Sequence, residues 1–429
     1  MMASEADVIR SWEGVVERIV APEFGTAVTQ TVQLRTLDTL VAATVGLRLA
    51  ESRPLLQLPG SVPEDRIRCL VAAVRATEID DIYLPGCATI GSVVVPTALV
   101  LAGTLPLDAV AVVGAIAAGY EVMANFSAMI DGAAVLYRGC WPTLAAAPIA
   151  AAAVAARLWG LDRSQFLSAL ALAVSRSHSR TSRQVPRWLQ LGHAAVDGVL
   201  AARAAGAGFK ASPGAIFDWA HSAGLPLHIE CLAAGSLPRI AEMDSKAFPT
   251  SRQGLAAVEA FIELHRQSPV AVDDPVEIVV PGAYLGMIGK NLPPFDRLGS
   301  LLSVPYQLAL IASAPQALYD VARIHPPLSE TMASRLGHTT MRSDPEFDRS
   351  YPQHWGARVT VGAGTPAVRS STVLDPFGSS RKPLAWSDIC RKAANLAIPN
   401  GLPIDWAQPL QQTVLMGASC QDILQSIRR

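Results

Sequence analysis

The sequence has few of the features that mark nucleic-acid-binding, nucleotide-binding and metal-binding proteins. Charged residues make up 17% of the 429 residues and aromatic residues 6%, and the formal net charge is −1. Lysine and arginine form no runs, which argues against a basic surface for nucleic acid. The chain contains no GxGxxG or GxxxxGK[ST] loop and no HExxH or HxxxH ligand spacing. We therefore expect no nucleic-acid partner, no cofactor and no metal.

Cysteine is also scarce, and its positions show no paired spacing. The six cysteines are Cys69, Cys87, Cys140, Cys231, Cys390 and Cys420. Without a CxxC pattern they are typical of reduced thiols rather than of a disulfide or zinc framework, so we expect a cytoplasmic protein. The first residues, MMASEADVIRSWEGVV, are acidic with helical periodicity, which does not fit a signal peptide.

Half of the residues are hydrophobic, yet the apolar stretches are interrupted. The interrupting residues are Pro96, Pro106, Asp108, Pro148 and Arg157. They keep each apolar stretch below the roughly 20 residues that a membrane span needs, so we expect no membrane partner. The length predicts two domains. A high apolar content with little charge indicates a large core and an oligomer with a sizeable interface, which we expect to be a homodimer.

The first half of the chain has helical periodicity, and the second half is mixed. Helices are expected over 5–23, 35–50, 64–77, 96–105 and 107–129. After residue 246 we expect a strand at 275–281, helices at 301–311 and 329–336, and a strand pair in ARVTVGAG and VRSSTV. The fold class is therefore mainly α, with a large all-helical domain and a smaller α+β domain.

One central stretch, Arg138 to Gly208, organises the helical half. Its helices consist largely of alanine and other small residues, which allow close approach. Asp162 is expected to be an N-cap, with Gln165 completing a capping box. Three such helices would form a tight buried core, with the polar ends at 138–143 and 178–190 sharing one rim.

Five segments of the chain, in this order, resemble the MmgE/PrpD family, which includes 2-methylcitrate dehydratase, cis-aconitate decarboxylase and iminodisuccinate epimerase. They are RTLDTLVAATVGLRLA, EIDDIYLPGCATIGSVVVP, GCWPT with GLD and LGHAAVDGVLAARAAGAGF, KAFPTSRQGLAAVEA, and SVPYQLA. The resemblance implies a helical domain over 1–240, completed by 398–429, and an α+β lid domain over 245–395. It also implies an active site between the two domains.

Glu78, Asp80 and Asp81 place three carboxylates within four positions. Closely spaced like charges raise each other's pKa, which suits proton transfer near neutral pH. A solvated loop or a helix cap is the alternative. The resemblance assigns the segment to the family's aspartate-rich active-site motif, in which Glu78 replaces the first aspartate.

Arg180, Arg183 and Arg187 lie close together in the sequence before the third small-residue helix. Arginine binds a carboxylate through two parallel hydrogen bonds, so these residues are candidates for holding an acidic substrate. Ordinary surface arginines are the alternative. The resemblance places a lysine of the family at Arg187, so charge is kept while a group that can lose a proton is not.

Lys246 in SKAFP and Tyr306 in SVPYQ match a lysine and a tyrosine of the family. A lysine in a partly buried cleft can act as a base or bind a carboxylate, whereas an exposed lysine near a helix end is the alternative. A tyrosine hydroxyl can polarise a carbonyl or donate a proton, although a lone tyrosine is more often part of a core. Arg252 follows in the same segment as Lys246 and is a further substrate-binding candidate.

Four positions where the resemblance leads us to expect histidine hold Thr89, Trp141, Gln190 and Ser251. Histidine is the usual proton-transfer side chain near neutral pH. Their replacement removes most of the acid–base groups that dehydration of a hydroxy acid would use. The nearby His193, in LGHAA, is either a substrate contact or a structural residue at a helix start.

We therefore expect a cofactor-independent lyase or isomerase that acts on a carbon next to a carboxylate or carbonyl. Lys246, Glu78, Asp80, Asp81 and Tyr306 are the catalytic candidates. The substrate is expected to be larger and less polar than methylcitrate or aconitate. The alternative is a catalytically silent relative that binds an acidic metabolite or a partner protein.

Overall fold

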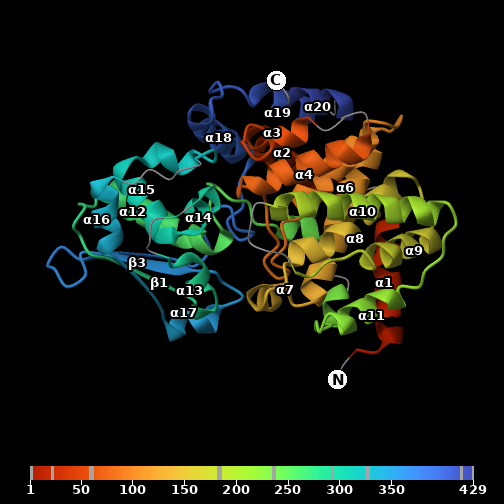
Figure 1. Ribbon diagram of the computed structural model, residues 1–429, viewed down its shortest axis with the longest axis horizontal. Coiled ribbons are helices and arrows are strands. Elements are labelled where there is room, and N and C mark those ends of the chain that lie inside the picture. Colours follow the sequence, from red (N-terminus) through yellow and green to blue (C-terminus); the bar gives the residue numbers. More distant parts are fainter. Residues whose placement is uncertain are drawn as a thin grey trace. The chain divides into compact units, whose positions relative to one another are not determined.

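A computed structural model describes residues 3–20, 24–57, 62–180, 186–233, 238–290, 294, 296–323, 329–415 and 419–427. Within these residues the chain forms 20 α-helices and one four-stranded sheet, so the fold is mainly α (Figure 1). Residue contacts divide the chain into two units. The helical unit comprises Met1–Ala76, Asp80–Asp244 and Ala407–Arg429, and the mixed unit comprises Thr77–Ile79 and Ser245–Trp406.

This division differs from the expected domain boundaries at two places. The short segment Thr77–Ile79 groups with the mixed unit, although it lies in the middle of the helical half of the sequence. Residues 398–406 also belong to the mixed unit rather than to the returning C-terminal segment. They are held there because the Asn400 carboxamide donates to the carbonyl of Tyr319 at 2.9 Å and to that of Leu396 at 2.7 Å.

The helical unit contains thirteen of the α-helices in the described part of the chain. They are α1 (Glu5–Val20), α2 (Thr26–Gly46), α3 (Arg53–Leu56), α4 (Pro63–Ala76), α5 (Gly91–Ala102), α6 (Ala109–Met129), α7 (Gly132–Val135), α8 (Pro142–Leu158), α9 (Arg163–Val174), α10 (Pro186–Gly206), α11 (Gly214–Ser222), α19 (Gln408–Leu415) and α20 (Cys420–Ser426). Short 3-10 turns at Leu136–Arg138, Ile229–Leu232 and Arg239–Glu242 connect them.

Two helix starts are capped by an aspartate, and the cap at Asp162 was predicted from the sequence. The Asp108 carboxylate accepts from the backbone N–H of Ala111 at 2.8 Å and caps α6. Asp162 and Gln165 form the reciprocal capping box of α9. By contrast, α10 begins at Pro186, so the final part of the stretch expected to be a polar loop is helical. Proline at a helix start lacks only an N–H that would have no intrahelical partner, so it favours this start.

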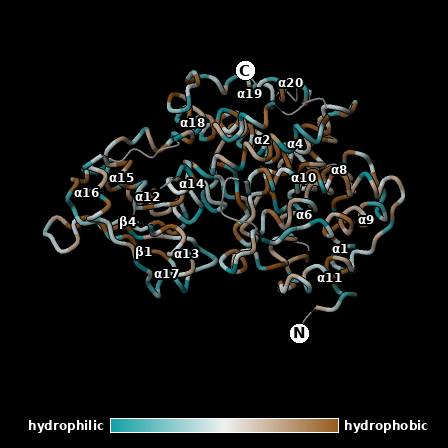
Figure 2. The backbone as a smooth tube through the Cα atoms, in the orientation of Figure 1, coloured by the Kyte–Doolittle hydropathy of each residue, from teal (hydrophilic) through white to brown (hydrophobic). Residues whose placement is uncertain are grey.

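The core of the helical unit is built on α8, which packs against α6, α9 and α10. Its residues are nearly all buried, and α6 and α8 are largely coloured as hydrophobic in Figure 2. Glycines bring the neighbouring helices close: a Cβ on Gly198 of α10 would lie 2.0 Å from the Pro148 carbonyl oxygen. A Cβ on Gly119 of α6 would lie 2.6 Å from a Val154 methyl group. Small side chains therefore set the spacing between these helices.

Helix α6 reaches 21 residues and is apolar enough to cross a membrane by length and composition. The sequence prediction that interruptions keep every apolar stretch below this length is therefore wrong for α6, because Asp108 caps the helix and leaves its interior unbroken. Two thirds of its apolar window, 67%, is buried inside the helical unit. This is the pattern of a core helix.

The mixed unit is organised around a sheet with strand order β2-β1-β3-β4. Its strands are β1 (Val276–Val280), β2 (Thr339–Ser343), β3 (Ala357–Val361) and β4 (Arg369–Val373). β1 pairs with β2 in parallel and with β3 antiparallel, and β3 pairs antiparallel with β4. The predicted β1 strand and the β3–β4 pair are confirmed. The polar edge strand β2 was not predicted, because its sequence, TTMRS, shows no alternating apolar pattern.

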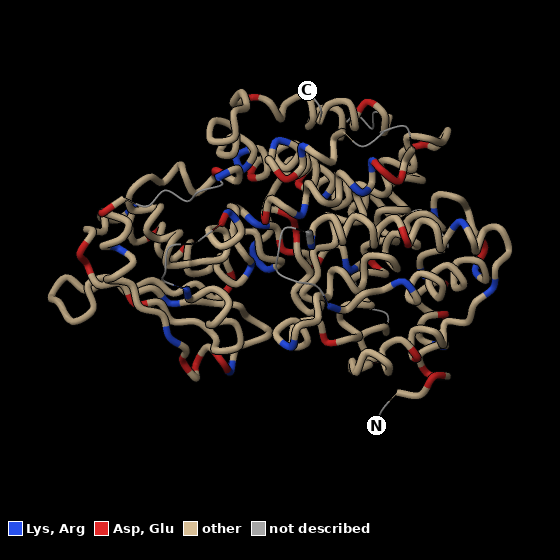
Figure 3. Tube along the Cα trace, in the orientation of Figure 1, with Lys and Arg blue, Asp and Glu red and all other residues tan. Residues whose placement is uncertain are grey.

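Seven α-helices accompany this sheet in the described residues. They are α12 (Leu255–Gln267), α13 (Gly282–Ile288), α14 (Arg297–Leu302), α15 (Val304–Ser313), α16 (Glu330–Gly337), α17 (Pro345–Ser350) and α18 (Trp386–Ala397). Figure 1 shows α12 on one side of the sheet and α13 and α17 on the other. The helix expected over 301–311 is divided at Ser303, whose hydroxyl accepts from the Tyr306 N–H and caps α15. Figure 3 shows charged residues of both signs along the chain.

The close approach of α10 to α8 gives a direct test of this packing. Gly198→Ala should destabilise the protein by about 3 kcal/mol or more, because the added methyl group meets a backbone carbonyl that cannot rotate away. The control is Gly14→Ala in α1, where the new Cβ would meet only the end of the Arg18 side chain at 3.8 Å. That change should be neutral or stabilising by about 0.5 kcal/mol. Equal melting temperatures for the two variants would contradict the packing argument.

Candidate active site

The mixed unit buries an ion pair between Lys246 and Glu78. The Lys246 Nζ donates to Glu78 Oε2 at 3.2 Å, and the two side chains are only 1% and 4% exposed. Removing two charges from water costs several kcal/mol per ion, which only good mutual geometry and further hydrogen bonds can offset. The structure therefore brings together two predicted catalytic residues that lie 168 positions apart in the sequence.

Glu78 also has an unusual backbone. Its φ angle is +57°, in the left-handed region that residues with a side chain rarely adopt. Such a conformation costs on the order of 1–3 kcal/mol and persists only where the surroundings hold it. Strained residues of this kind cluster at functional sites, so the strain at Glu78 adds to the argument from its burial.

Ser251 and Arg252 lie nearby in the sequence, and both are buried in the mixed unit. The Ser251 N–H donates to the Leu301 carbonyl, while its hydroxyl oxygen has no hydrogen-bond partner among the described residues. The Arg252 guanidinium lies over the Trp355 ring, with 5.8 Å between Cζ and the ring centroid. A cation over an aromatic face is stabilised electrostatically, which helps to hold this buried charge.

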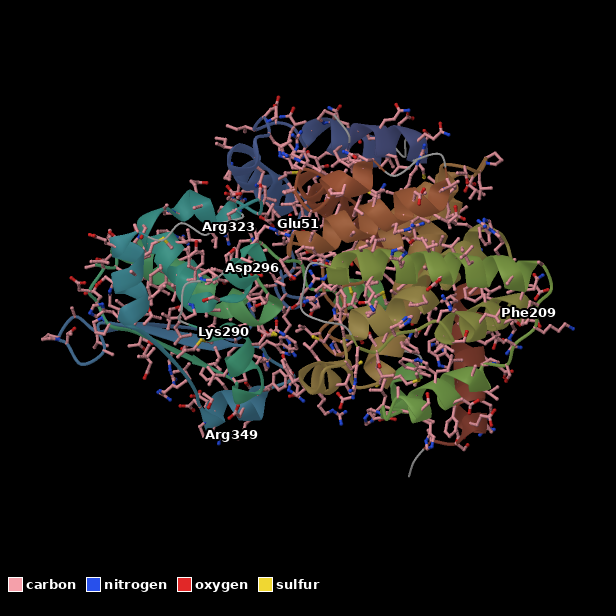
Figure 4. The ribbon with its side chains drawn as sticks, in the orientation of Figure 1. Glu51, Phe209, Lys290, Asp296, Arg323 and Arg349 are labelled. Atoms are coloured by element: carbon pink, nitrogen blue, oxygen red, sulfur yellow. The ribbon has the colours of Figure 1, made fainter. Side chains whose placement is uncertain are left out.

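Tyr306 is fully buried on α15 and packs with Ala309, Leu310 and Met332. Burial raises the pKa of Tyr306 to about 12, while the nearby Arg323 guanidinium opposes this rise. Arg323, labelled in Figure 4, is itself buried and donates to the carbonyl oxygens of Ala317 and Asp320. At neutral pH the Tyr306 hydroxyl is therefore protonated, so it can form hydrogen bonds or donate its proton but cannot act as a base.

In the helical unit, Asp80 and Asp81 have separate partners. Arg75 Nη1 donates to Asp80 Oδ1 at 3.3 Å, and both side chains are buried. Asp81 Oδ2 accepts from the Tyr120 hydroxyl at 2.6 Å, and Asp81 Oδ1 accepts from the N–H of Gly91 at 2.8 Å. Because Gly91 is the first residue of α5, Asp81 caps that helix. This arrangement gives Asp81 a clear structural role.

Burial raises the pKa of Asp81 to about 6, and the Arg35 guanidinium and the two hydrogen bonds limit the rise. Desolvation disfavours the charged carboxylate, so the dominant cause is the loss of water around it. Gly91 is needed for this arrangement, since a Cβ there would lie 2.6 Å from the Tyr120 hydroxyl. The close spacing of carboxylates in the sequence is thus not the cause of the shift.

The two polar ends of the central stretch meet, as predicted. The Trp141 N–H donates to the Ser179 carbonyl at 2.8 Å, and Cys140 forms a β-bridge with Arg180. The Arg187 guanidinium lies over the Trp141 ring, with 4.2 Å between Cζ and the ring centroid. The sequence thus predicted the common rim, and the structure adds the stacking of Arg187 on Trp141.

The remaining predicted residues of the helical unit have different settings. The Thr89 N–H donates at 3.1 Å to the hydroxyl of Thr143, which lies two positions after Trp141. Gln190 is half-buried on α10. His193 is exposed, and partial burial of its ring together with the Arg68 guanidinium lowers its pKa. Arg183 lies outside the described residues.

Sequence reasoning missed Lys392, a second buried lysine of the mixed unit. Its Nζ donates to the carbonyl oxygen of Ile79 at 2.6 Å, one residue after Glu78. The signal was present in the sequence: Ile389, Ala393 and Leu396 mark the apolar face of an amphipathic helix, and Lys392 falls on that face. A lysine at a core position is rare unless it is paired.

Comparison with known protein families finds two domains along the chain. The MmgE/PrpD N-terminal domain matches residues 67–223, and the MmgE/PrpD C-terminal domain matches residues 248–401. No curated protein matched the chain. The two domain matches cover most of the chain in the expected order, so the protein belongs to the MmgE/PrpD family. Members of this family are generally lyases and dehydratases, which indicates lyase-type activity in general terms.

The setting of Asp81 predicts how stability depends on pH. Its raised pKa means that the contribution from protonated Asp81 is fully present below about pH 4 and is lost as the pH rises through about 6. An asparagine can accept from Gly91 and donate to Tyr120 without ionising. Asp81→Asn should therefore gain stability relative to the natural protein by about 3 kcal/mol between pH 4 and pH 7.

Urea unfolding at pH 4 and pH 7 measures this change. An equal change in the free energy of unfolding of the two proteins between these pH values would contradict it. The matched variant Asp81→Ala removes both acceptor oxygens. It should lose about 2–4 kcal/mol at pH 4, because the Tyr120 hydroxyl and the Gly91 N–H are then buried without their acceptor. The loss should be smaller at pH 7, because the natural protein no longer has the contribution of protonated Asp81 there.

Proposed function

We propose that this chain is a cofactor-independent lyase or isomerase that moves a proton at a carbon next to a carboxylate or carbonyl. The observation that carries the proposal is the buried Lys246–Glu78 pair, in which Glu78 has a strained backbone. The pair provides an ammonium group and a carboxylate group, and side chains of these two kinds act as general acids and bases.

The anion formed by removing a proton from carbon must be stabilised by positive charge or hydrogen-bond donors. In the helical unit, Arg187 is the best candidate, because Trp141 orients its guanidinium by stacking. In the mixed unit, Arg252 is held in a similar way over Trp355. Both support an acidic or carbonyl substrate, since guanidinium groups bind carboxylates through two hydrogen bonds.

The replaced histidines direct the proposal away from methylcitrate and aconitate. Trp141 contributes a large apolar side chain where the family has histidine, and Thr89 contacts Thr143 instead of offering an imidazole. We propose a larger, less polar intermediate of specialised metabolism as substrate, with dehydration, isomerisation or cyclisation as outcome. The lid role of the mixed unit, the homodimer and the cytoplasmic location remain predictions.

A second function is favoured by one specific observation. The four expected histidine positions hold side chains that cannot transfer protons near neutral pH, which fits a catalytically silent relative that binds an acidic metabolite or a partner protein. The buried, strained Glu78 argues for the enzyme, because a binding protein gains nothing from strain in a carboxylate that already has an ammonium partner.

Deuterium incorporation tests the proposal directly. The protein is incubated in D₂O with citrate, methylcitrate, aconitate, iminodisuccinate and larger β-keto or β-hydroxy acids, and mass shifts and products are measured. We expect turnover or exchange of a bulky acid and none of the tricarboxylates. Exchange in no compound, together with thermal stabilisation by one of them, would support the binding protein instead.

The ion pair itself gives a test that separates stability from catalysis. Lys246→Met should destabilise the protein by about 3–5 kcal/mol, because the Glu78 carboxylate stays buried without its ammonium partner. Adding Glu78→Gln removes that charge and should restore most of the stability. Proton exchange at the substrate carbon should fall at least about 100-fold in both variants.

Thermal unfolding and the deuterium assay measure the two effects. A double variant that recovers activity along with stability would remove the pair from the mechanism. A double variant as unstable as Lys246→Met would show that burial of the unpaired carboxylate is not the cause of the instability.

A further inference from the structure

Lysine is rare in this protein, and its distribution is uneven. The chain contains five lysines and thirty arginines. Lys210, Lys290 and Lys382 are exposed, whereas Lys246 and Lys392 are buried, with 1% and 3% of their surface accessible. Both buried ammonium groups donate to adjacent residues of one short segment, Thr77–Ile79. Two buried lysines converging on three residues is a specific arrangement, because buried ammonium groups are costly.

The position of Lys392 in α18 shows that the fold alone does not require it. Ile389, Ala393 and Leu396 share its buried face, and an apolar side chain there would continue the same packing. The preceding residue, Arg391, is on the exposed side, where it pairs with Asp388. An ammonium group at position 392 therefore has a role other than packing. Its hydrogen bond to the Ile79 carbonyl indicates that this role concerns the segment Thr77–Ile79.

The contacts of Ile79 fix the peptide groups on both sides of it. Its N–H donates to the Thr77 hydroxyl at 3.3 Å, and its carbonyl accepts from Lys392 at 2.6 Å. The residue before it, Glu78, has the strained φ of +57°. A left-handed residue relaxes to negative φ unless its neighbours are held. Relaxation would rotate the Glu78 side chain away from Lys246, so the fixed Ile79 maintains the ion pair.

We propose that Lys392 is a positioning residue for the Lys246–Glu78 pair. It acts through the Ile79 carbonyl, which it holds so that Glu78 stays in its left-handed conformation and its carboxylate stays on Lys246. The contribution of this positioning to catalysis rests on the proposed function, but the positioning itself can be measured without any substrate.

The test uses the rarity of lysine. Protein labelled with [ε-¹³C]lysine should give five side-chain signals, and the Lys246 signal is identified by its loss in Lys246→Met. We expect Lys392→Met to remove its own signal and also to shift that of Lys246. Lys392→Arg keeps N–H donors and a positive charge, and should leave the Lys246 signal near its natural position. The control, Arg391→Met on the same helix, should not move it.

A Lys246 signal that stays in place in folded Lys392→Met protein would overturn the proposal. If that variant does not fold, Glu78→Gly decides, because glycine adopts φ of +57° without strain. Lys392→Met should then fold when residue 78 is glycine, with a melting temperature close to that of Glu78→Gly alone. Failure to fold in both backgrounds would overturn the proposal.

Activity is the second readout and separates the two proposals. In the deuterium assay Lys392→Met should lower kcat at least tenfold with KM changed less than twofold. Lys392→Arg should keep most of the kcat of the natural protein. A shifted Lys246 signal in a protein without activity towards any acid would support positioning while the proposed function fails. Full activity of Lys392→Met despite a shifted Lys246 signal would overturn the proposal that positioning by Lys392 contributes to catalysis.

Discussion

A charge can be buried only where another charge or a set of hydrogen bonds replaces the water it loses, and this constraint shapes both units of the protein. In the mixed unit, Glu78 is buried against Lys246, and the adjacent Ile79 carbonyl accepts from a second buried ammonium. In the helical unit, Arg75 pairs with Asp80. The residues that these cationic side chains contact, Glu78, Ile79 and Asp80, lie in a single run, 77–81. In this run the chain passes from the helical unit to the mixed unit and back.

The helical unit provides a rigid frame for Asp80 and Asp81, the two residues of this run that belong to it. Glycine and alanine let α6, α8 and α10 approach so closely that an added methyl group would meet backbone or branched side chains. Asp81 connects the run to this frame, because it caps α5 and accepts from Tyr120 on α6. Asp81 is thereby tied to two of the helices of the unit by hydrogen bonds.

Membership of the MmgE/PrpD family and the changed residues together define the chemistry that can be expected. The chain carries the lysine, the acidic segment and the tyrosine that its resemblance to the family assigns to the site. At the histidine positions, Trp141 now stacks with Arg187 and Thr89 bonds to Thr143. Arg187 keeps a positive charge and Lys246 is paired with Glu78, and the absence of histidine at the positions where the resemblance leads us to expect it is the basis for proposing a different substrate within the same general class of reaction.

Much of this could be read from the sequence because the signals are local. Helix periodicity, the Asp108 and Asp162 caps and the β-branched strand at 276–280 depend on residues within a few positions of each other. The rim formed by Trp141 and Ser179 was also predictable, since short connections between small-residue helices leave few places for their polar ends. The edge strand β2 was missed because its own sequence has no alternating apolar pattern, and only its pairing with β1, about 60 residues away, makes it a strand.

The sequence by itself determined the family, the mainly helical fold and the presence of an acidic segment with a matching lysine. Tertiary structure alone decided which of the three neighbouring carboxylates meets that lysine. Glu78 is directed to Lys246, Asp80 to Arg75, and Asp81 to Tyr120. The physical reason is that Coulomb and hydrogen-bond interactions depend on distance in space and on burial, and a left-handed residue at position 78 redirects the chain in a way that composition and spacing do not record.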